Sequence, residues 1–172
     1  MLSGISIEPF RGDLEGLERM AHSSWRDEYG IESFPNFYRT EFLKFLFDRI
    51  EDKTHLLAAY RGNEIVSFLA NLPQRFHLDG HTHRAVYSCL MVTRKELLRQ
   101  GLGKAIIDEA LKLNQKFHYD FSLLTLEKGH RSTQMIKKLE ETGKPVEWVK
   151  RNYVIARILD RDRVVDSEGL KK

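Results

Sequence analysis

Cysteine and long hydrophobic runs are scarce in this sequence. Cys89 is the only cysteine among 172 residues, so an internal disulfide and a zinc site built on a Cys-x-x-Cys pair are both excluded. No stretch approaches the roughly 18 uninterrupted apolar residues of a membrane-spanning helix. The first residues also lack the basic start and apolar core of a secretory signal peptide. We therefore expect a cytoplasmic protein without a membrane partner.

A large excess of charge of one sign is also missing. Lysine and arginine number 28 against 25 aspartate and glutamate residues, which gives a formal net charge of +3. Nucleic acid is not expected as a partner, because nucleic-acid-binding domains concentrate far more positive charge. The 41% hydrophobic and 31% charged residues are typical of one soluble domain, long enough to bury a core without metal or disulfides. The mildly positive charge suits a phosphorylated small molecule.

Hydrophobic periodicity predicts a strand and two helices in the first 50 residues. Alternation in residues 4–10 indicates the strand, and apolar spacing of 3.6 residues after Asp13 indicates a helix that ends at Gly30. A second helix follows Pro35. We expect its buried side to carry Tyr38, Phe42, Leu43, Leu46, Phe47 and Ile50.

Three strands are predicted next, at residues 55–62, 64–78 and 84–92. The dipeptides Gly62-Asn63 and Asp79-Gly80 between them suit tight hairpin turns, so the three strands should form an antiparallel meander.

The second half of the chain alternates helices and strands. We predict a helix from Leu102, a strand at 121–126, a helix from about Arg131 to Gly143, and a final hairpin of residues 146–149 and 153–159. Residues 1–159 should form one domain, followed by a charged tail or truncated linker at 160–172.

Residues 97–111, LLRQGLGKAIIDEAL, place two glycines directly before an apolar helical repeat. The first amides of a helix have no partner within the helix, and the helix dipole is positive at that end. Gly101 and Gly103 remove side chains that would keep a phosphate from the backbone, while Arg99 and Lys104 add charge. The pattern favours a phosphate site; the alternative is an ordinary helix start after a flexible loop.

Two common phosphate motifs do not fit these residues. A Walker A loop would need Gly at Leu98 and Ser or Thr at Ala105. A dinucleotide fingerprint would need a third Gly at Ile106 and a parallel strand-helix-strand unit, whereas the preceding strands are predicted to be antiparallel. Neither nucleotide-binding fold is therefore expected.

The stretch RQGLGK, residues 99–104, resembles the [Q/R]xxGxG/A pyrophosphate loop of the GNAT N-acetyltransferase superfamily. SCLMV, residues 88–92, stands where that family has its coenzyme A strand, and the order of elements across residues 4–159 is similar. The resemblance implies an α/β (α+β) fold of the GNAT type. Such a fold has a mixed, largely antiparallel central sheet of about seven strands with four helices, in the order β-α-α-β-β-β-α-β-α-β-β.

The resemblance also implies where acetyl-CoA, the cofactor of the family, would bind. The loop would hold the pyrophosphate through Arg99, Gln100, Gly101, Leu102, Gly103 and Lys104. In the family a bulge splays the fourth strand from the fifth, and the backbone there pairs with pantetheine and polarises the thioester carbonyl. The corresponding residues are Leu90, Met91 and Val92. Ser132 stands where the family often has an Asn, and it keeps a hydrogen-bonding group.

Acetyl transfer to an amine requires the removal of a proton from that amine. An amine with a pKa of about 10.4 costs roughly 4.6 kcal/mol to deprotonate at pH 7, whereas a leaving thiolate costs only about 2 kcal/mol. Glu127, at the end of the predicted strand 121–126, is our candidate base; an exposed loop acid is the alternative. The family commonly has a Tyr acid where this chain has Leu139, and its absence should slow turnover without abolishing it.

The segment between the first two helices is the family's usual place for acceptor recognition. Trp25, Glu28 and Tyr29 could grip a cationic amine through aromatic faces and a carboxylate. The alternative is a solvated helix end with Trp25 in the core. On the coenzyme strand, Tyr87 and Ser88 must point to opposite faces, and the sequence leaves open which of them faces the cleft.

We predict an acetyl-CoA-dependent N-acetyltransferase that acts on an amine of a small molecule or protein by direct attack in a ternary complex. The alternative is a non-catalytic coenzyme A-binding sensor or scaffold domain. The reason for this alternative is Leu139, which stands where the family commonly has its Tyr acid. The sequence leaves open whether the protein forms a homodimer. No metal is expected, because His81 and His83 lack a third ligand nearby.

Overall fold

The computed structural model describes residues 3–30, 36–126, 131–143 and 146–148. The chain divides into two compact units, Met1–Thr125 and Leu126–Lys172. The boundary predicted after residue 159 falls outside the described residues.

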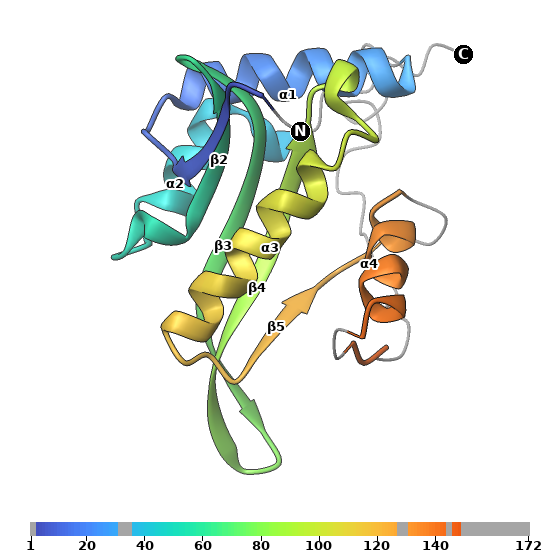
Figure 1. The fold of residues 1–172 in the computed structure, drawn as a ribbon. Coiled ribbons are helices and arrows are strands. Elements are labelled where there is room, and N and C mark those ends of the chain that lie inside the picture. The colour runs from blue at the N-terminus through green and yellow to red at the C-terminus, as the bar shows by residue number, and fades with distance from the viewer. Residues whose placement is uncertain (1–2, 31–35, 127–130, 144–145, 149–172) are drawn as a thin grey trace, which may run out of the picture. The chain divides into compact units, whose positions relative to one another are not determined.

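The described elements follow the predicted order as far as the fourth helix (Figure 1). In the first unit the strands are β1 (Ile5–Pro9), β2 (Leu56–Arg61), β3 (Glu64–Leu78), β4 (His81–Thr93) and β5 (Phe121–Leu124). The helices are α1 (Leu14–Tyr29), α2 (Thr40–Phe47) and α3 (Leu102–Lys116). Three short 3₁₀ turns are η1 (Asn36–Tyr38), η2 (Lys53–His55) and η3 (Lys95–Leu97). The second unit contains α4 (Arg131–Glu141).

The strands form one sheet in the order β1-β2-β3-β4-β5. β1 to β4 pair in antiparallel fashion, and β5 runs parallel to β4. The predicted mixed, largely antiparallel sheet with four helices is thus confirmed, but the described residues contain five strands rather than about seven. Of the predicted last hairpin, residues 146–148 belong to no strand, and residues 149 and 153–159 lie outside the described part.

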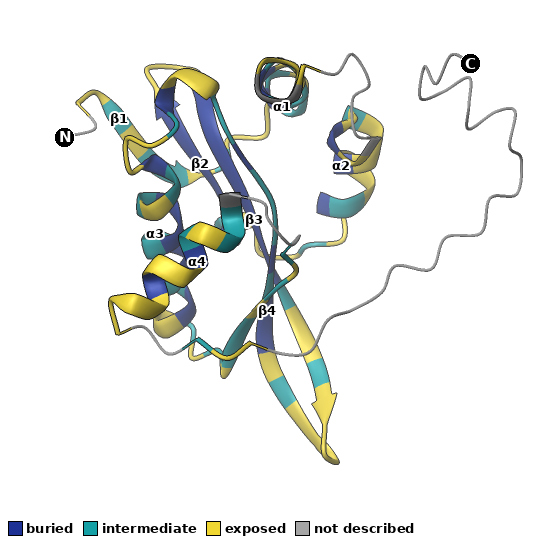
Figure 2. Cartoon of the chain, turned by 90° about the vertical axis from the view of Figure 1, so that its right-hand side faces the viewer, coloured by how far each residue is buried: buried dark blue, intermediate teal, exposed yellow. Residues whose placement is uncertain are grey.

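Within the first unit, α1 and α2 cover one face of the sheet and α3 covers the other (Figure 2). Alternate residues of β2 serve the two faces, as the period of a strand requires. Ala58 and Tyr60 are buried in the cluster that contains Leu17 of α1 and Leu43 of α2. Ala59 is buried in the cluster that contains Leu102 of α3.

The buried side of the second helix differs from the prediction. Leu43 and Phe47 are buried and Tyr38 lies buried in η1, but Phe42 is 41% exposed. The sequence TEFLKFLF is apolar on several sides, so its spacing alone does not select one face. Packing selects Leu43 and Phe47, which are four residues apart, and leaves Phe42 about 100° away from Leu43 around the helix.

The ends of α1 have the predicted caps. The Asp13 carboxylate accepts a hydrogen bond from the Gly16 amide at 2.8 Å, which satisfies one of the free amides of the first turn. Gly30 ends the helix with a φ of 64°, and its amide donates to the Arg26 carbonyl. A left-handed residue at this position is the common way to stop a helix, and glycine adopts it without strain.

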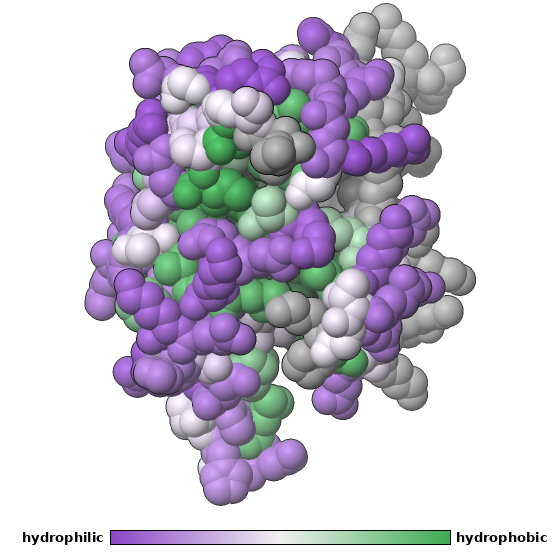
Figure 3. Space-filling view, viewed as in Figure 1, coloured by the Kyte–Doolittle hydropathy of each residue, from purple (hydrophilic) through white to green (hydrophobic). Residues whose placement is uncertain are grey.

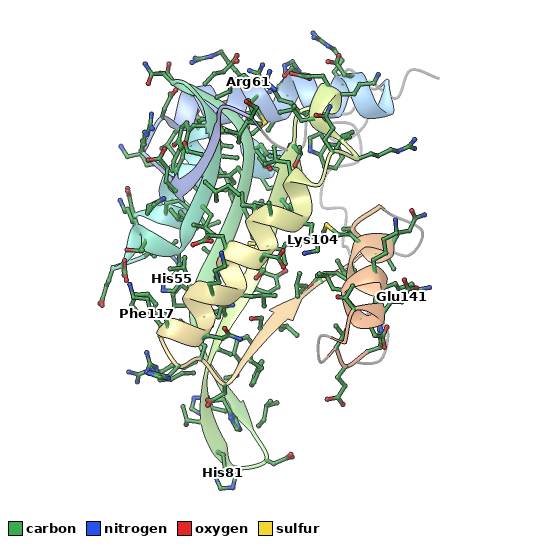
Figure 4. All side chains as sticks on the ribbon, in the orientation of Figure 1. His55, Arg61, His81, Lys104, Phe117 and Glu141 are labelled. Carbon is green, nitrogen blue, oxygen red and sulfur yellow. The ribbon has the colours of Figure 1, made fainter. Side chains whose placement is uncertain are left out.

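The β3–β4 hairpin extends beyond its neighbours in the sheet, and His81 lies at its tip (Figure 4). β2 pairs with β3 only as far as Ala70, and β5 pairs with β4 only from Ala85 onward. Pro73 lies in the open part of β3 and has no N–H to offer, which discourages pairing with another chain.

The face seen in Figure 3 is largely hydrophilic, with apolar areas between the charged side chains. Among the helices that the structure describes, none is long and apolar enough to cross a membrane.

Candidate functional site

β4 and β5 are paired over only part of the length of β4. The pairing runs from Ala85 opposite Phe121 to Ser88 opposite Leu124. β4 continues to Thr93, and in the part of the chain that the structure describes, the edge from Cys89 to Thr93 has no partner on the side of β5. Backbone groups along this edge are therefore open to an extended ligand.

A bulge lies where this open edge begins. Val92 is opposite Phe68 and Cys89 is opposite Ala70, so Leu90 and Met91 together face the single residue Leu69. Leu90 has a φ of 53°, which leucine rarely adopts and which costs on the order of 1–3 kcal/mol. The bulge involves Leu90 and Met91 of the predicted pantetheine site and directly precedes Val92.

The connection from β4 to α3 is a structured loop that contains η3. Leu97 at the end of η3 and Leu102 at the start of α3 are both buried in the cluster that contains Val66. Between these anchors, Arg99 has a φ of 63° and Gly101 has a φ of 86°. Two left-handed residues thus turn the chain from η3 into the helix within a few positions.

Among the described residues, the first backbone amides of α3 have no hydrogen-bond partner. The N-cap residue is Gly101, without a side-chain cap hydrogen bond. The first amide of the helix with a backbone acceptor is that of Ala105, which donates to the Gly101 carbonyl at 2.9 Å. Amides at the positive end of a helix form an anion site. A Cβ added to Gly101 would have no neighbour within 4 Å, so the space before the helix is open.

The polar side chains of the predicted pyrophosphate loop differ in whether they already have a hydrogen-bond or ion-pair partner within the chain. Arg99 is exposed. Lys104, on the first turn of α3 (Figure 4), pairs with Asp108 one turn later at 2.5 Å. The Gln100 side chain donates to the Glu96 carbonyl at 2.6 Å, so it stabilises the loop itself. The groups at the start of α3 that are available to an anion are therefore the backbone amides and Arg99.

Cys89 begins the open edge of β4. It packs against the core cluster beneath α1 and α2, and burial raises the pKa of its thiol to about 11. At neutral pH Cys89 is therefore a protonated, weakly nucleophilic thiol.

Tyr87 and Ser88 lie on opposite faces of β4. Tyr87 packs against the core cluster beneath α1 and α2, and its hydroxyl donates to Thr125 Oγ1 at 3.2 Å. The Ser88 hydroxyl donates to Asn71 Oδ1 at 2.6 Å, and Asn71 in turn contacts Asn114 of α3. Tyr87 thus faces the side of the sheet that carries α1, and Ser88 faces the side that carries α3.

The predicted acceptor segment is only partly described. Trp25 is partly buried, with ring centroids 6.2 Å from Phe37 and 6.4 Å from Tyr38. Its main contacts are those of a core residue. Glu28 and Tyr29 lie in the last turn of α1, and their side chains are outside the described part. Lys95 of η3 donates to the Asp27 carbonyl at 2.5 Å, which ties the end of α1 to the loop before α3.

The remaining predicted residues lie beyond the first unit. Glu127 is outside the described residues. Ser132 and Leu139 are residues of α4 in the second unit.

A buried polar cluster was missed by the sequence analysis. It consists of Asn71, Ser88, Asn114 and Ser122, joined by hydrogen bonds of 2.6 to 2.8 Å. A signal was present, because Asn71 interrupts the apolar strand sequence SFLANL and Asn114 follows Ile106 and Ala110 on the apolar side of a helix. A polar residue at a position predicted to be buried requires partners.

A separate pocket of about 620 Å³ lies between the first half of α1 and the β2–β3 turn. Its charged lining residues are Asp13, Arg19, Arg61, Glu64 and Arg94. Arg94 pairs with Glu64 at 2.5 Å, so opposite charges offset one another in this pocket.

Comparison with known proteins gives one family and a common fold. The sequence matches the model of the acetyltransferase (GNAT) family over residues 15–141. The search of curated proteins gives no match.

Three solved structures illustrate the similarity of fold. A putative acetyl transferase from Pyrococcus furiosus is 18% identical, with 88% of this chain and 99% of that chain covered and a TM-score of 0.62. An aminoglycoside acetyltransferase from an uncultured soil metagenomic sample, in complex with trehalose, is 15% identical, with 89% and 97% covered and a TM-score of 0.60. N-myristoyltransferase from Saccharomyces cerevisiae with bound myristoyl-CoA is 14% identical, with 80% of this chain and 42% of that chain covered and a TM-score of 0.59.

Proposed function

Because the chain belongs to the acetyltransferase (GNAT) family, we propose that it transfers an acetyl group from acetyl-CoA to an amine by direct attack in a ternary complex. The acceptor is an amine of a small molecule or a protein. We further propose that the protein acts in the cytoplasm.

The observation that carries this proposal is the arrangement at the end of β4. The open edge from Cys89 to Thr93 leads through the loop directly to the free amides at the start of α3. The edge offers backbone groups to an extended amide-containing chain, and the helix start offers amides to an anion. Coenzyme A has such a chain attached to a pyrophosphate, so both parts fit the groups present.

Each part of the site has its own role in binding. The amides of Gly101, Leu102, Gly103 and Lys104, with Arg99 beside them, hold the pyrophosphate. The backbone of Leu90, Met91 and Val92 pairs with the pantetheine arm, and an amide at this bulge polarises the thioester carbonyl. The resemblance to the family makes Ser132 a candidate for a further hydrogen bond to the coenzyme. The bound coenzyme supplies an acyl group activated as a thioester.

Direct attack is favoured over a covalent relay by the state of Cys89. Burial raises the pKa of its thiol to about 11, so a thiolate at neutral pH would cost about 5 kcal/mol. An acceptor amine with a pKa of about 10.4 also has to lose a proton first. We propose that Glu127 acts as the base that removes this proton from the amine. We propose that Trp25, Glu28 and Tyr29 contact the acceptor.

A change at Gly101 tests the coenzyme site. Gly101→Trp places a bulky side chain in the open space before α3, and we expect it to weaken acetyl-CoA binding at least about tenfold. Gly101→Ala is the matched control, because it imposes the same left-handed strain with a side chain that meets no atom within 4 Å. Titration calorimetry measures both. Wild-type affinity in Gly101→Trp, or no binding by the wild type, contradicts the proposal.

The second candidate is a coenzyme A-binding domain without strong catalysis, which Leu139 favours because the family's usual Tyr acid is missing there. A thiol-release assay with a panel of amines, including the aminoglycosides named for one structural neighbour, separates the two. Tight coenzyme binding without turnover on any amine selects the binding domain.

A further inference from the structure

Four side chains form a continuous chain of hydrogen bonds through the sheet and into α3. The Ser88 hydroxyl donates to Asn71 Oδ1 at 2.6 Å. The Asn71 amide nitrogen donates to Asn114 Oδ1 at 2.8 Å, and the Asn114 amide nitrogen donates to Ser122 Oγ at 2.7 Å. Both amide oxygens accept and both amide nitrogens donate, so each asparagine has one required orientation.

The members of this chain come from four different elements. Asn71 belongs to β3, Ser88 to β4, Asn114 to α3 and Ser122 to β5. β4 and β5 separate immediately after Ser88, whose partner Leu124 is the last residue of β5. Ser88 lies in the last pair before the strands part, and Ser122, opposite Val86, lies two pairs earlier. The hydrogen-bonded cluster therefore joins β4 and β5 to α3 and to β3 close to that point.

The cluster is buried, which gives it a large effect on geometry. Asn71 is fully buried, and Ser88 and Asn114 are nearly so. Any shift of β5 that stretches one of these bonds leaves a polar group without a partner in a low-dielectric interior, which is energetically unfavourable. Apolar side chains would fill the same space without this penalty. The polar cluster thus favours one position of β5 over neighbouring positions.

A second contact acts on the opposite face of the sheet. The Tyr87 hydroxyl of β4 donates to Thr125 Oγ1, just after the end of β5, at 3.2 Å. The point at which the strands part is thus held from both faces, by Ser122 on the side of α3 and by Thr125 on the side of α1.

We propose that Asn114 is a positioning residue that, through Ser88 and Ser122, holds β5 where it leaves β4 and so sets the gap that receives the pantetheine arm and the acyl group. This inference rests on the proposed function of the site. Asn114 touches neither the coenzyme nor the acceptor; it acts through the two strands.

The position of Asn114 separates its effect from that of the pyrophosphate loop. Thirteen residues along α3 divide it from Gly101, a distance of about 20 Å along the helix axis. A change at Asn114 should therefore alter binding of the acyl-pantetheine part and leave binding of the nucleotide part unchanged. ADP contains the pyrophosphate and lacks the pantetheine arm, so it reports on the loop alone.

The sharpest test uses an isosteric pair at Ser122, which is only half-buried. Ser122→Thr keeps the hydroxyl that accepts from Asn114, and Ser122→Val has the same shape without it. We expect Ser122→Val to weaken acetyl-CoA binding about tenfold relative to Ser122→Thr. ADP should bind both variants with the wild-type affinity, as measured by titration calorimetry.

Asn114→Leu provides the direct test, with Gln115→Leu as its control on the exposed side of the same helix. Asn114→Leu should show the same selective loss of acetyl-CoA affinity. This variant leaves the Asn71 amide without its Asn114 partner. The double variant Asn71→Leu/Asn114→Leu removes both amides and should show the same selective loss. If Asn114→Leu does not fold, the Ser122 pair decides.

Two outcomes overturn the inference in distinguishable ways. If Ser122→Val and Ser122→Thr bind acetyl-CoA and ADP with the same ratio of affinities as the wild type, the cluster is structural only and Asn114 does not set the gap. If the wild type binds neither acetyl-CoA nor ADP, the proposed function itself is wrong, and the inference fails with it.

Discussion

Two residues with unusual backbone conformations stand on either side of the end of β4. Leu90 has a φ of 53° in the bulge, and Arg99 has a φ of 63° in the loop before α3. Left-handed backbone costs residues other than glycine on the order of 1–2 kcal/mol. Strain of this kind concentrates at functional sites, where the surrounding structure maintains it. Both residues belong to the proposed coenzyme site.

His55 is a buried histidine away from this site. It is 1% exposed, and its ring lies 4.8 Å from that of Phe117 and 5.4 Å from that of Tyr119 (Figure 4). Among the described residues its Nδ1 atom has no hydrogen-bond partner. Burial lowers the pKa of His55 below 6.5, and the charge of Asp52 opposes this shift only in part.

This lowered pKa predicts a loss of stability in mild acid. As the pH falls, His55 takes up a proton in the unfolded chain at a higher pH than in the folded chain. The contribution of His55 to the free energy of unfolding is therefore complete above about pH 6.5 and is lost as the pH falls below that value. His55→Phe keeps an aromatic ring and removes the proton. We expect its free energy of unfolding, measured in urea, to fall less between about pH 7 and pH 5, by up to about 1.4 kcal/mol per pH unit.

The control for this prediction is His81→Phe at the exposed hairpin tip. This variant should keep the pH dependence of the wild type. An unchanged pH dependence in His55→Phe would show that His55 does not cause the acid sensitivity.

At the scale of elements, α1 and α3 begin in different ways. One amide in the first turn of α1 is satisfied by the Asp13 carboxylate, whereas the first turn of α3 has a glycine at the N-cap and no side-chain cap. A capped helix start is a structural feature, and an uncapped start next to an open strand edge is available to a ligand. The contrast supports α3 rather than α1 as the anion site.

The cap of α1 should contribute measurably to stability. Asp13→Ala removes the acceptor of the Gly16 amide, and we expect the free energy of unfolding to fall by about 1 kcal/mol. Asp13→Asn keeps an acceptor oxygen and should lose much less. Chemical denaturation of the three proteins measures the difference, and equal stabilities of the Ala and Asn variants would contradict the assigned cap.

At the scale of the whole molecule, the net charge of +3 is spread over 172 residues, whereas coenzyme A concentrates its negative charge on its phosphates. Exposed basic groups such as Arg99 and Lys104 near the start of α3 should therefore add an electrostatic attraction to that of the helix amides. Both side chains are exposed, so salt screens them effectively.

Acetyl-CoA binding should accordingly weaken with salt. Raising NaCl from about 0.05 to about 0.5 M should increase the Kd about three- to tenfold, because the screening length falls well below the separation of the charges. Calorimetric titration at several salt concentrations measures this change. Pantetheine, which carries no charge, is the control ligand and should show little salt dependence. A constant Kd for acetyl-CoA would mean that the helix amides alone bind the anion.

The order of elements and the glycine turn were predictable because they depend on local rules. Hydrophobic spacing, the Asp13 cap and the Gly62-Asn63 and Asp79-Gly80 turns act within a few residues, and each appears in the structure as predicted. The buried side of α2 was predicted wrongly at Phe42, since a short helix with apolar residues on several sides takes its orientation from its neighbours.

The sequence by itself determined the family, the order of elements through α4 and the place of the glycine turn before α3, because periodicity and turn chemistry depend on neighbouring residues. Tertiary structure decided where β5 leaves β4, that Tyr87 faces α1 while Ser88 faces α3, and that Asn71 and Asn114 meet. Asn71 and Asn114 are separated by 43 positions. Their contact depends on how the helix lies on the sheet, which no local pattern specifies.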